Sequence, residues 1–505
     1  MILRVHILSA FLLMVVCGCA SIKPDAKVNE AIDLVEQRTG ERPEWTVSWD
    51  DEPPLWDGKA VLVLDQALGL ALRNNRELRA DIEMIGQANA DLVQAGLLQN
   101  PSFNFMLMFP SGGGRAMLRS SALPMMPLQD LWLIPAREEV AKARLQQAVL
   151  RVADRAIEIT EAVKKVYARL RYTQRAIELI GDNMQVVDQS TQIIRIRLAS
   201  GQATQVEVNL SQIRHLRLRS ELLAMEAGHR GAQRELLMLM GVAGATDQWV
   251  VQPLRELKDS LSPPADEAAL LAMATEQRLD LKAAEWDTAA AERRIALAAR
   301  EGWPDLAIGL TFERAPAPPA QNQRFVGKLG NAAAQGTANA ITGMPPGGPM
   351  VAPFSPKMRE VKYGLGPMIE MEVPIFDQNQ AQVARAFHEY RQRVAEYEAR
   401  LQEITRMVRE TQVMFHQAYD QIEFYRREIL PAVERNLAVA RQAYVAGQED
   451  LTVYLQVQED LLMTRLRILE FCRDWLIRLA ELERQVGGRL TESGPTSRPA
   501  SAPGQ

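Results

Sequence analysis

The feature that most constrains this chain is an unbroken apolar repeat in its first half. Apolar or small residues recur there in alternating steps of four and three, at Leu145, Val149, Val152, Ala156, Ile159, Val163, Val166, Leu170, Thr173, Ile177, Ile180, Met184, Val187, Thr191, Ile194 and Leu198. A period of about 3.5 residues sustained this long predicts a left-handed supercoiled helix. From Arg137 to Leu198 such a helix is about 93 Å long at about 1.5 Å per residue. A single globular domain needs no helix of that length.

A second run of the same kind lies in the other half of the chain. It passes through Val383, Phe387, Tyr390, Val394, Tyr397, Leu401, Ile404, Val408, Thr411, Phe415, Ala418, Ile422, Tyr425 and Ile429. Pro431 then interrupts it, because proline removes one helix hydrogen bond, and we expect a bend there. The repeat resumes at Ala432 and reaches Ala443. A plain coiled-coil rod accounts for these helices as well as a tunnel does.

The sequence indicates an internal duplication, with two copies of one pattern. Leu78-Arg79-Ala80 matches Leu281-Lys282-Ala283 at an offset of 203 residues, and Gly201-Gln202 matches Gly447-Gln448 at an offset of 246. The larger second offset indicates an insertion in the second copy. Residues 315–358, dense in Pro, Gly, Ala and Asn, have the composition of a long loop and fit that insertion.

Between the helices the apolar period falls to two, which predicts strands. The first copy has one such segment at 103–109 and a partner at 128–134; the second has 306–312 and 366–373. In the last of these, Ile369 and Met371 alternate with Glu370 and Glu372. Each half therefore reads as helix, strand, loop, strand, long helix, turn and helix.

Strands with one apolar and one polar face suit a membrane barrel, with lipid outside and water inside. A bilayer tolerates strands only in a closed sheet, because open edges leave backbone groups unpaired. Four strands cannot close, since known barrels start at about eight. The sequence therefore predicts that the barrel forms only when several copies assemble.

The amino terminus has the features of a bacterial targeting signal. Arg4 precedes an apolar stretch at 7–16 that is too short to span a bilayer as a helix. The following Val16-Cys17-Gly18-Cys19 resembles a lipobox, and the resemblance to lipoproteins implies cleavage before Cys19 and acylation of that residue, palmitate included. An ordinary signal peptide with incidental cysteines is the alternative. Once Cys19 is acylated, only Cys472 remains, so no disulfide framework is expected.

The sequence gives little support for nucleic-acid binding, enzyme activity or metal binding. A net charge of −5 argues against nucleic-acid binding. The five histidines are scattered, and neither a metal-ligand cluster nor a phosphate loop nor a nucleophile elbow is present, so we expect no enzyme activity, cofactor or metal site. Methionines gather in the strand and loop segments. Soft-metal contact is one interpretation of them, and apolar packing is the simpler one.

The ordered set of segments resembles the TolC-like outer-membrane efflux family. The resemblance rests on residues 64–75 as the opening helix, Gly96-Leu97-Leu98-Gln99-Asn100-Pro101 as the helix-to-strand junction, Val373-Pro374-Ile375-Phe376-Asp377 as the return to helix, and Tyr444-Val445-Ala446-Gly447-Gln448 as the periplasmic turn. It covers residues 60–488, in order and twice over. The implied fold is mainly α with a small β part, in two tandem repeats. Three copies would form a 12-strand β-barrel and a 12-helix α-barrel.

The resemblance also implies a function. The protein would be a passive exit duct in the outer membrane that receives cargo from an inner-membrane pump through a periplasmic adaptor, with homotrimer, adaptor, pump and outer-membrane lipid as partners. A lipid-tethered periplasmic coiled-coil scaffold without a pore is the alternative, and the paired strands argue against it. The helical turns would form the periplasmic tip, where gating or adaptor docking occurs. The candidate tip residues are Gly201, Gln202, Glu207, Tyr444, Gly447, Gln448, Glu449 and Asp450.

Two details of the implied duct depart from the pattern or stay open. In the best-known family members aspartates lie six and nine residues after the second glycine, where this chain has Val453 and Gln456. A gate ring made by Glu207, Glu449 and Asp450 and a merely solvated turn are both compatible with the sequence. Glu370 and Glu372 are candidate lumen charges at an outer mouth that favours cations.

These inferences divide the chain as follows. We expect a signal peptide at 1–18, a lipidated extended segment at 19–60, a first efflux repeat at 61–250, a second repeat at 251–488 containing the loop insertion, and a disordered tail at 489–505.

Overall fold

The structure of the protein, a computed structural model, describes residues 24–45, 61–100, 102, 104–108, 117–242, 249–252, 266–316 and 361–490. The predicted signal peptide, Cys19, the insertion from 317 onward and the tail after 490 lie outside these residues. Two compact units are present. The first draws on residues 1–93, 141–291 and 389–505, and the second on 94–140 and 292–388.

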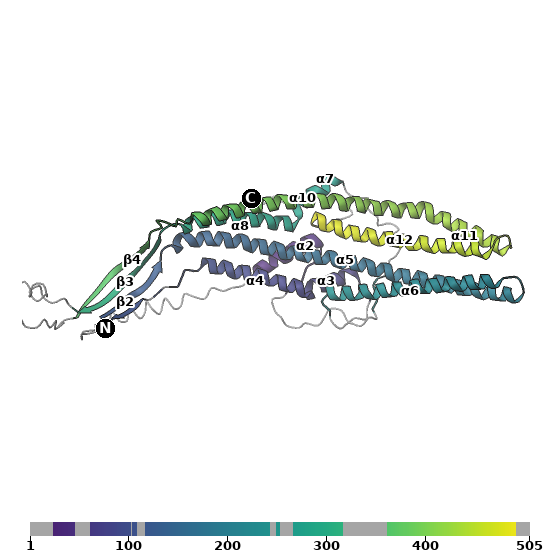
Figure 1. The fold of residues 1–505 in the computed structure, drawn as a ribbon, viewed down its shortest axis with the longest axis horizontal. Coiled ribbons are helices and arrows are strands. Elements are labelled where there is room, and N and C mark those ends of the chain that lie inside the picture. The colour runs from purple at the N-terminus through teal and green to yellow at the C-terminus, as the bar shows by residue number, and fades with distance from the viewer. Residues whose placement is uncertain are drawn as a thin grey trace, which may run out of the picture. The chain divides into compact units, whose positions relative to one another are not determined.

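The helices of the two halves follow the same order (Figure 1). The first half contains α2 (Asp25–Thr39), α3 (Leu64–Asn74), α4 (Arg76–Gly96), α5 (Asp130–Ala199) and α6 (Gln205–Leu239). The second half contains α7 (Glu267–Gln277), α8 (Leu279–Glu301), α10 (Gln380–Phe424), α11 (Leu430–Val445) and α12 (Leu451–Val486).

The two predicted long helices are confirmed. α5 is a single helix of 70 residues, and its apolar repeat forms the buried side: Val149, Val163, Ile180 and Val187 are fully buried. In the second half, a π-helical segment at Tyr425–Ile429 stands between α10 and α11, directly before Pro431. Here the N–H of Leu430 donates to the carbonyl of Tyr425, five residues back. Proline has no N–H to donate, and this missing donor is the physical cause of the irregular turn beside it, as expected for an interruption at Pro431.

The helices recur at the offsets found in the sequence. α7 and α8 begin 203 residues after α3 and α4, and α12 begins 246 residues after α6. A buried contact recurs with them. The side-chain amide of Asn75 donates to the carbonyl of Leu239 (2.9 Å), and the guanidinium of Arg278 donates to that of Gln485 (3.1 Å). The α3–α4 and α7–α8 junctions thus each hold the last turn of a hairpin's second helix. The exact limits of the two repeats stay a prediction.

Each hairpin helix ends in a glycine turn of one type. Gly201, Gly241, Gly447 and Gly487 all have positive φ, between 64° and 79°. At the first, the N–H of Gln202 donates to the carbonyl of Arg197 and that of Gly201 to Leu198, the double bond of a Schellman turn. A positive φ without a Cβ penalty is the reason for glycine there. Gly201 and Gly447, two of the candidate tip residues, therefore stand at turns that require a positive φ.

The strands form one antiparallel sheet in the order β1-β2-β3-β4, with β1 at Phe105–Met108, β2 at Met117–Pro127, β3 at Asp305–Pro316 and β4 at Val361–Glu372 (Figure 1). β1, β3 and β4 overlap the predicted strands. β3 extends through Pro316, two residues into the predicted loop.

The strand predicted at 128–134 is wrong. The partner of β1 lies earlier, at Met117–Pro127, and α5 already begins at Asp130. Leu133, Ala136 and Val140 are spaced three and four residues apart, and they pack with Leu297 in one small core. This helical period decides the structure, because an apolar segment of seven residues fits either period when it is read alone.

The prediction of an extended segment at 19–60 also needs correction. Within it, residues 25–39 form α2, whose Val28, Ala31, Ile32 and Val35 are buried in the largest core of the first unit. Their spacing of three and four residues is that of an amphipathic helix.

Candidate functional site

One face of the four-stranded sheet is apolar. Along β3 and β4 the register places large apolar residues opposite one another: Leu306 with Met371, Ile308 with Ile369 and Phe312 with Leu365. The side chain of Ile369 is 70% exposed, and those of Leu365 and Met371 are more than half exposed. Phe312 stacks on Tyr363 of the next strand, with ring centroids 6.0 Å apart. An apolar surface of this kind needs a nonpolar environment.

The opposite face of the same two strands is small and acidic. Its opposed residues are Asp305 with Glu372, Ala307 with Glu370, Gly309 with Met368, Thr311 with Gly366 and Glu313 with Gly364. Small side chains leave room on this side, and four carboxylates give it a negative charge. Alternation of this kind is typical of barrel strands that have lipid on one side and water on the other.

The register shows where the two predicted lumen charges lie within the sheet. Glu370 and Glu372 lie at the end of β4 that leads into α10, opposite the first residues of β3 that follow α8. They therefore lie at the end of the sheet next to α8 and α10, and their place in the outer mouth of a barrel stays a prediction. Asp305, which lies opposite Glu372, was missed because the sequence does not give the register of one strand against another.

The sheet has two open edges in the described part of the chain. β1 is paired there only with β2, and β4 only with β3. Unpaired edge groups invite pairing with another strand.

The turns of the two hairpins meet in a small core. Ile194 and Val208 come from the first hairpin, and Leu451 and Leu455 from the second. Next to this core, the guanidinium of Arg197 lies 5.0 Å from the ring centroid of Tyr444, and Tyr444 stacks on Tyr454 at 5.5 Å. Tyr444 is thus a contact between the hairpins, which the sequence did not reveal because Arg197 comes from the other repeat.

The predicted acidic tip residues have different surroundings. Glu207 belongs to a capping box: its carboxylate accepts from the N–H of Thr204 (3.1 Å), and its own N–H donates to the Thr204 hydroxyl (3.4 Å). This use ties Glu207 to the start of α6. Glu449 and Asp450 are exposed on the second turn. Gln202 and Gln448 are exposed and complete the glycine turns through their backbone N–H groups.

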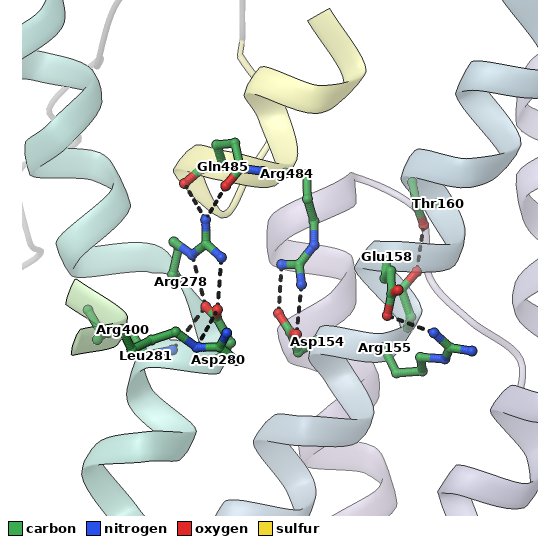
Figure 2. Close-up of polar contacts among 11 residues, drawn as sticks. Asp154, Arg155, Glu158, Thr160, Arg278, Asp280, Leu281, Arg400, Arg484 and Gln485 are labelled. Atoms are coloured by element: carbon green, nitrogen blue, oxygen red, sulfur yellow. Dashed lines mark hydrogen bonds and ion pairs between the residues drawn. The ribbon is translucent and has the colours of Figure 1, made fainter. Parts of the chain in front are cut away.

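A second group of polar residues forms a network of arginine and carboxylate side chains (Figure 2). Its members come from α5, α8, α10 and α12 and from Arg278, the residue before α8. Arg484 of α12 binds Asp154 of α5 with two hydrogen bonds of 2.7 and 2.8 Å. Arg278 binds Asp280 in the same bidentate way, at 2.9 and 2.8 Å, and Arg400 approaches Asp280 to 3.5 Å. The Arg484–Asp154 pair joins the second repeat to the first.

The two carboxylates of this network differ in their electrostatic surroundings. Burial is the largest single effect on each carboxylate, and by itself it would raise the pKa of both. For Asp280, the hydrogen bonds from Arg278 and the charges of Arg278, Arg484 and Arg400 outweigh burial and hold its pKa below the usual value. For Asp154, burial prevails over Arg484, and Asp280 adds repulsion, so its pKa is raised. The Arg484 guanidinium has its pKa raised by Asp154 and Asp280 despite burial.

The lowered pKa of Asp280 predicts a pH dependence of stability. An unfolded aspartate titrates at about pH 3.9, so the contribution of ionised Asp280 is complete above that pH and is lost as the pH falls through the lower folded value. We expect the unfolding free energy of Asp280→Asn to be furthest below that of the wild type near neutral pH, and the gap to shrink in acid. Urea denaturation followed by helical circular dichroism at several pH values measures this. Glu403→Gln, an exposed carboxylate paired with Arg406, is the control and should show a small gap throughout.

The described residues offer neither a membrane-spanning helix nor a metal site. None of the helices there is long and apolar enough to cross a bilayer. Among the same residues, histidine, cysteine, aspartate and glutamate side chains nowhere form a group of three that could hold a metal ion.

Comparison with known proteins finds one family that matches the second half of the chain. Residues 270–488, which are less than half of the chain, match the family described as outer membrane efflux protein. This segment belongs to the outer membrane efflux protein family. The predicted resemblance to TolC-like outer-membrane efflux proteins is thereby confirmed, and the family consists of channel proteins and not of enzymes. No curated protein of similar sequence was found.

Solved structures extend the likeness in fold beyond this segment to most of the chain. A structure of CusC, whose subject is folding and transmembrane channel formation, is 18% identical with a TM-score of 0.65, covering 90% of this chain and 98% of that one. The CmeC outer membrane channel of Campylobacter jejuni is 14% identical, TM-score 0.64, with 90% and 93% covered. The open-state MtrE outer membrane channel of Neisseria gonorrhoeae is 16% identical, TM-score 0.63, with 91% and 98% covered. At these identities the likeness establishes the fold: mainly helical with few strands, as in the efflux channels.

Proposed function

We propose that the protein is a passive outer-membrane exit duct of an efflux system. The observation that carries the proposal is the four-stranded sheet with one apolar face, one small and acidic face, and two open edges. In a bilayer the open edges would cost several kcal/mol for each unpaired group, so they must pair with other strands. Three copies joined edge to edge give a closed barrel of 12 strands, within the range of known outer-membrane barrels. The long helices of the three copies then supply a 12-helix tunnel in the periplasm.

Cargo would reach the tip from an inner-membrane pump through a periplasmic adaptor, and the pump would supply the energy. Acylated Cys19 would anchor each copy to the outer membrane. Radiolabelled palmitate is then expected to enter the wild-type protein and to be absent from Cys19→Ser. Equal labelling of the two proteins would contradict the anchor and leave the duct in place.

The tip supports a gate held by contacts between the hairpins of one copy. Arg197 and Tyr444 join the two turns, and the capping box retains Glu207 at its own helix. Glu449 and Asp450 remain the exposed carboxylates that could repel one another around a threefold axis. A cation–π pair contributes about 0.5–1 kcal/mol at an exposed site, so its loss should favour opening without unfolding the tip.

The experiment that tests the proposed function measures oligomeric mass and planar-bilayer conductance of the membrane-extracted protein. A trimer with small, rarely open conductance supports the duct. Conductance that grows when Glu207, Glu449 and Asp450 are neutralised supports an electrostatic gate, and growth only in Arg197→Ala supports a gate held by the Tyr444 contact. A monomer that does not conduct would leave the tethered scaffold as the function.

The acidic face of the sheet leads to a prediction about ion selectivity. In a trimer, Glu370 and Glu372 together with Asp305 would ring the helix-proximal end of the barrel lumen, and we expect the open duct to favour cations. Glu370→Lys with Glu372→Lys should move the reversal potential in a salt gradient toward anion selectivity. Glu370→Asp with Glu372→Asp keeps the charge and should leave the potential unchanged. A potential that is the same in all three proteins would show that these residues do not face the pore.

A further inference from the structure

The contact between the two helical hairpins contains two separate apolar cores. Nearest the glycine turns lies the small core described above, which we call the tip core: Ile194, Val208, Leu451 and Leu455. Further from the turns, buried residues of α5, α6 and α12 form a second core, which we call the shaft core: Ala176, Ile180, Val187, Leu218, Leu462 and Leu466. Each core packs the first hairpin against α12, so the two cores are successive stages of one seam.

Polar side chains separate these two cores. On each of the three helices a heptad position between the cores holds a buried polar residue, Thr191 on α5, Ser211 on α6 and Gln458 on α12. We call these three residues the polar layer. A polar residue at a core position of a coiled coil lowers its stability relative to an apolar one. The seam between the first hairpin and α12 is therefore interrupted at the polar layer.

The hydrogen bonds of the polar layer lie within the first hairpin. The Thr191 hydroxyl donates to the carbonyl of Val187 (2.8 Å), and its oxygen lies 2.7 Å from that of Ser211. Because a hydroxyl has one hydrogen, Ser211 is the donor in the second bond. Asp188 and His215 form an ion pair of 2.8 Å between the same two helices. All these contacts join α5 to α6, and they stay intact when α12 moves away.

Gln458 enters the polar layer from α12 without such a partner. Its side-chain oxygen Oε1 is buried and accepts no hydrogen bond from any residue that the structure describes. An unsatisfied buried acceptor costs free energy in the closed seam, and it regains hydrogen bonds when water reaches it. Gln458 therefore favours the parting of α12 from the first hairpin at this level.

An ion pair does cross the seam beside the polar layer. Arg214 of α6 lies 2.9 Å from the carboxylate of Glu459 on α12. Burial lowers the pKa of Arg214 by more than the charge of Glu459 raises it. The Glu459 side chain is 36% exposed, so solvent also weakens the attraction between the two charges. This pair adds little to the strength of the seam.

The seam is held more firmly on the shaft side of the polar layer than on the turn side. On the shaft side, Lys164 of α5 pairs with Glu483 of α12 at 2.6 Å, and the bidentate arginine–aspartate pair of Figure 2 joins the same two helices. On the turn side, the hairpins meet through the tip core and through the contact of Arg197 with Tyr444. Separation on the turn side alone has to expose only a small apolar core.

We propose that the polar layer is the limit of the moving part of the tip. When the duct opens, α12 parts from the first hairpin between the turns and the polar layer, and the shaft core stays closed. The inference rests on the proposed function and deepens its account of the gate. On α12 the moving part then runs from Leu451 to Gln458, about two turns of helix.

The first experiment measures which cysteines become accessible when the tip opens. Leu455→Cys places a thiol in the tip core, and Leu462→Cys places one in the shaft core a heptad away on the same helix. Each is combined with the most conducting of the tip variants described above, and labelling by a water-soluble maleimide is followed in the membrane-extracted, full-length trimer. Buried Cys472 gives the background. We expect opening to speed the labelling of Leu455→Cys by about twofold to fivefold, the factor that an exposed cation–π pair supplies, and to leave Leu462→Cys unchanged.

The second experiment tests the cause. Gln458→Leu makes the seam apolar through the polar layer, and we expect the open probability of the same conducting variant to fall by about tenfold, because the closed seam no longer buries an unsatisfied acceptor. Gln456→Leu is the matched control. It makes the same change at an exposed position of α12, and the open probability should stay as it was. An equal open probability in the two variants would show that the polar layer does not control opening.

The outcomes separate the polar layer from the duct. If a tip variant conducts and opening speeds labelling by the same factor at both cysteines, the moving part extends beyond the polar layer and the inference is wrong. It is also wrong if conductance grows while neither cysteine is labelled faster, because the tip then opens without parting α12 from the first hairpin. If the protein forms no trimer and no variant conducts, the proposed function fails and the inference fails with it.

Discussion

Arg484→Met is expected to lower the unfolding free energy by about 3–5 kcal/mol, because it leaves Asp154 as an uncompensated buried charge. The two side chains are only 13% and 17% exposed and share two hydrogen bonds. Among the ion pairs of the described residues, the partner of Asp154 is Arg484, as Figure 2 shows. The measurement is urea denaturation of the solubilised protein, followed by helical circular dichroism. Arg467→Met on the same helix, whose pair with Glu470 is exposed, should change the midpoint only slightly.

The double variant shows how the pair acts. Asp154→Leu combined with Arg484→Met removes both charges, and replacing a buried pair by apolar groups is often neutral or stabilising. The double variant should therefore recover most of the stability that Arg484→Met loses. Equal loss in Arg484→Met and Arg467→Met would contradict a special role for the buried pair. Equal loss in the single and double variants would show that packing, and not charge, fixes the two repeats together.

The long helices could be predicted from the sequence because their signal is repeated many times. Each heptad contributes the same apolar spacing, so the burial of residues such as Val149 and Val187 follows from the pattern alone. The turn glycines could also be predicted from the sequence. Glycine recurs at the same offset in both copies, at the point where one helix ends and the next runs back antiparallel to it. Local chemistry repeated in two copies is the strongest kind of sequence signal.

Contacts between distant segments could not be predicted in this way. The 128–134 segment is apolar, and only its packing with Leu297 shows that a helix begins there. The role of Asp305 depends on the register of β3 with β4, and the contact of Arg197 with Tyr444 depends on how two hairpins from different repeats pack. The buried pair of Asp154 and Arg484 spans 330 residues of sequence. Each of these features is a tertiary contact between residues far apart in the sequence, so the periodicity within one segment does not predict it.

Gly241→Ala is expected to destabilise the protein much more than Gly201→Ala, although both glycines have a positive φ, of 64° and 73°. An alanine at either position pays about 1–2 kcal/mol for the left-handed backbone. At Gly201 nothing lies within 4 Å of the added Cβ. At Gly241 the Cβ would be 2.2 Å from the carbonyl oxygen of Asn74, which is backbone and can move only with the α3–α4 junction. Forcing that junction apart adds about 1–3 kcal/mol, as overpacking of a tight site does.

The second repeat offers the same comparison independently. Gly447 has a φ of 73° and open space around a Cβ, whereas at Gly487 the Cβ would be 2.8 Å from the backbone nitrogen of Arg278. Urea midpoints for the four alanine variants should fall into two pairs, with Gly241→Ala and Gly487→Ala the less stable pair. If all four lose the same stability, only the backbone conformation requires these glycines. Two pairs would show that both hairpins are fastened in one way, by the close approach of a glycine turn to the junction between two helices of the same repeat.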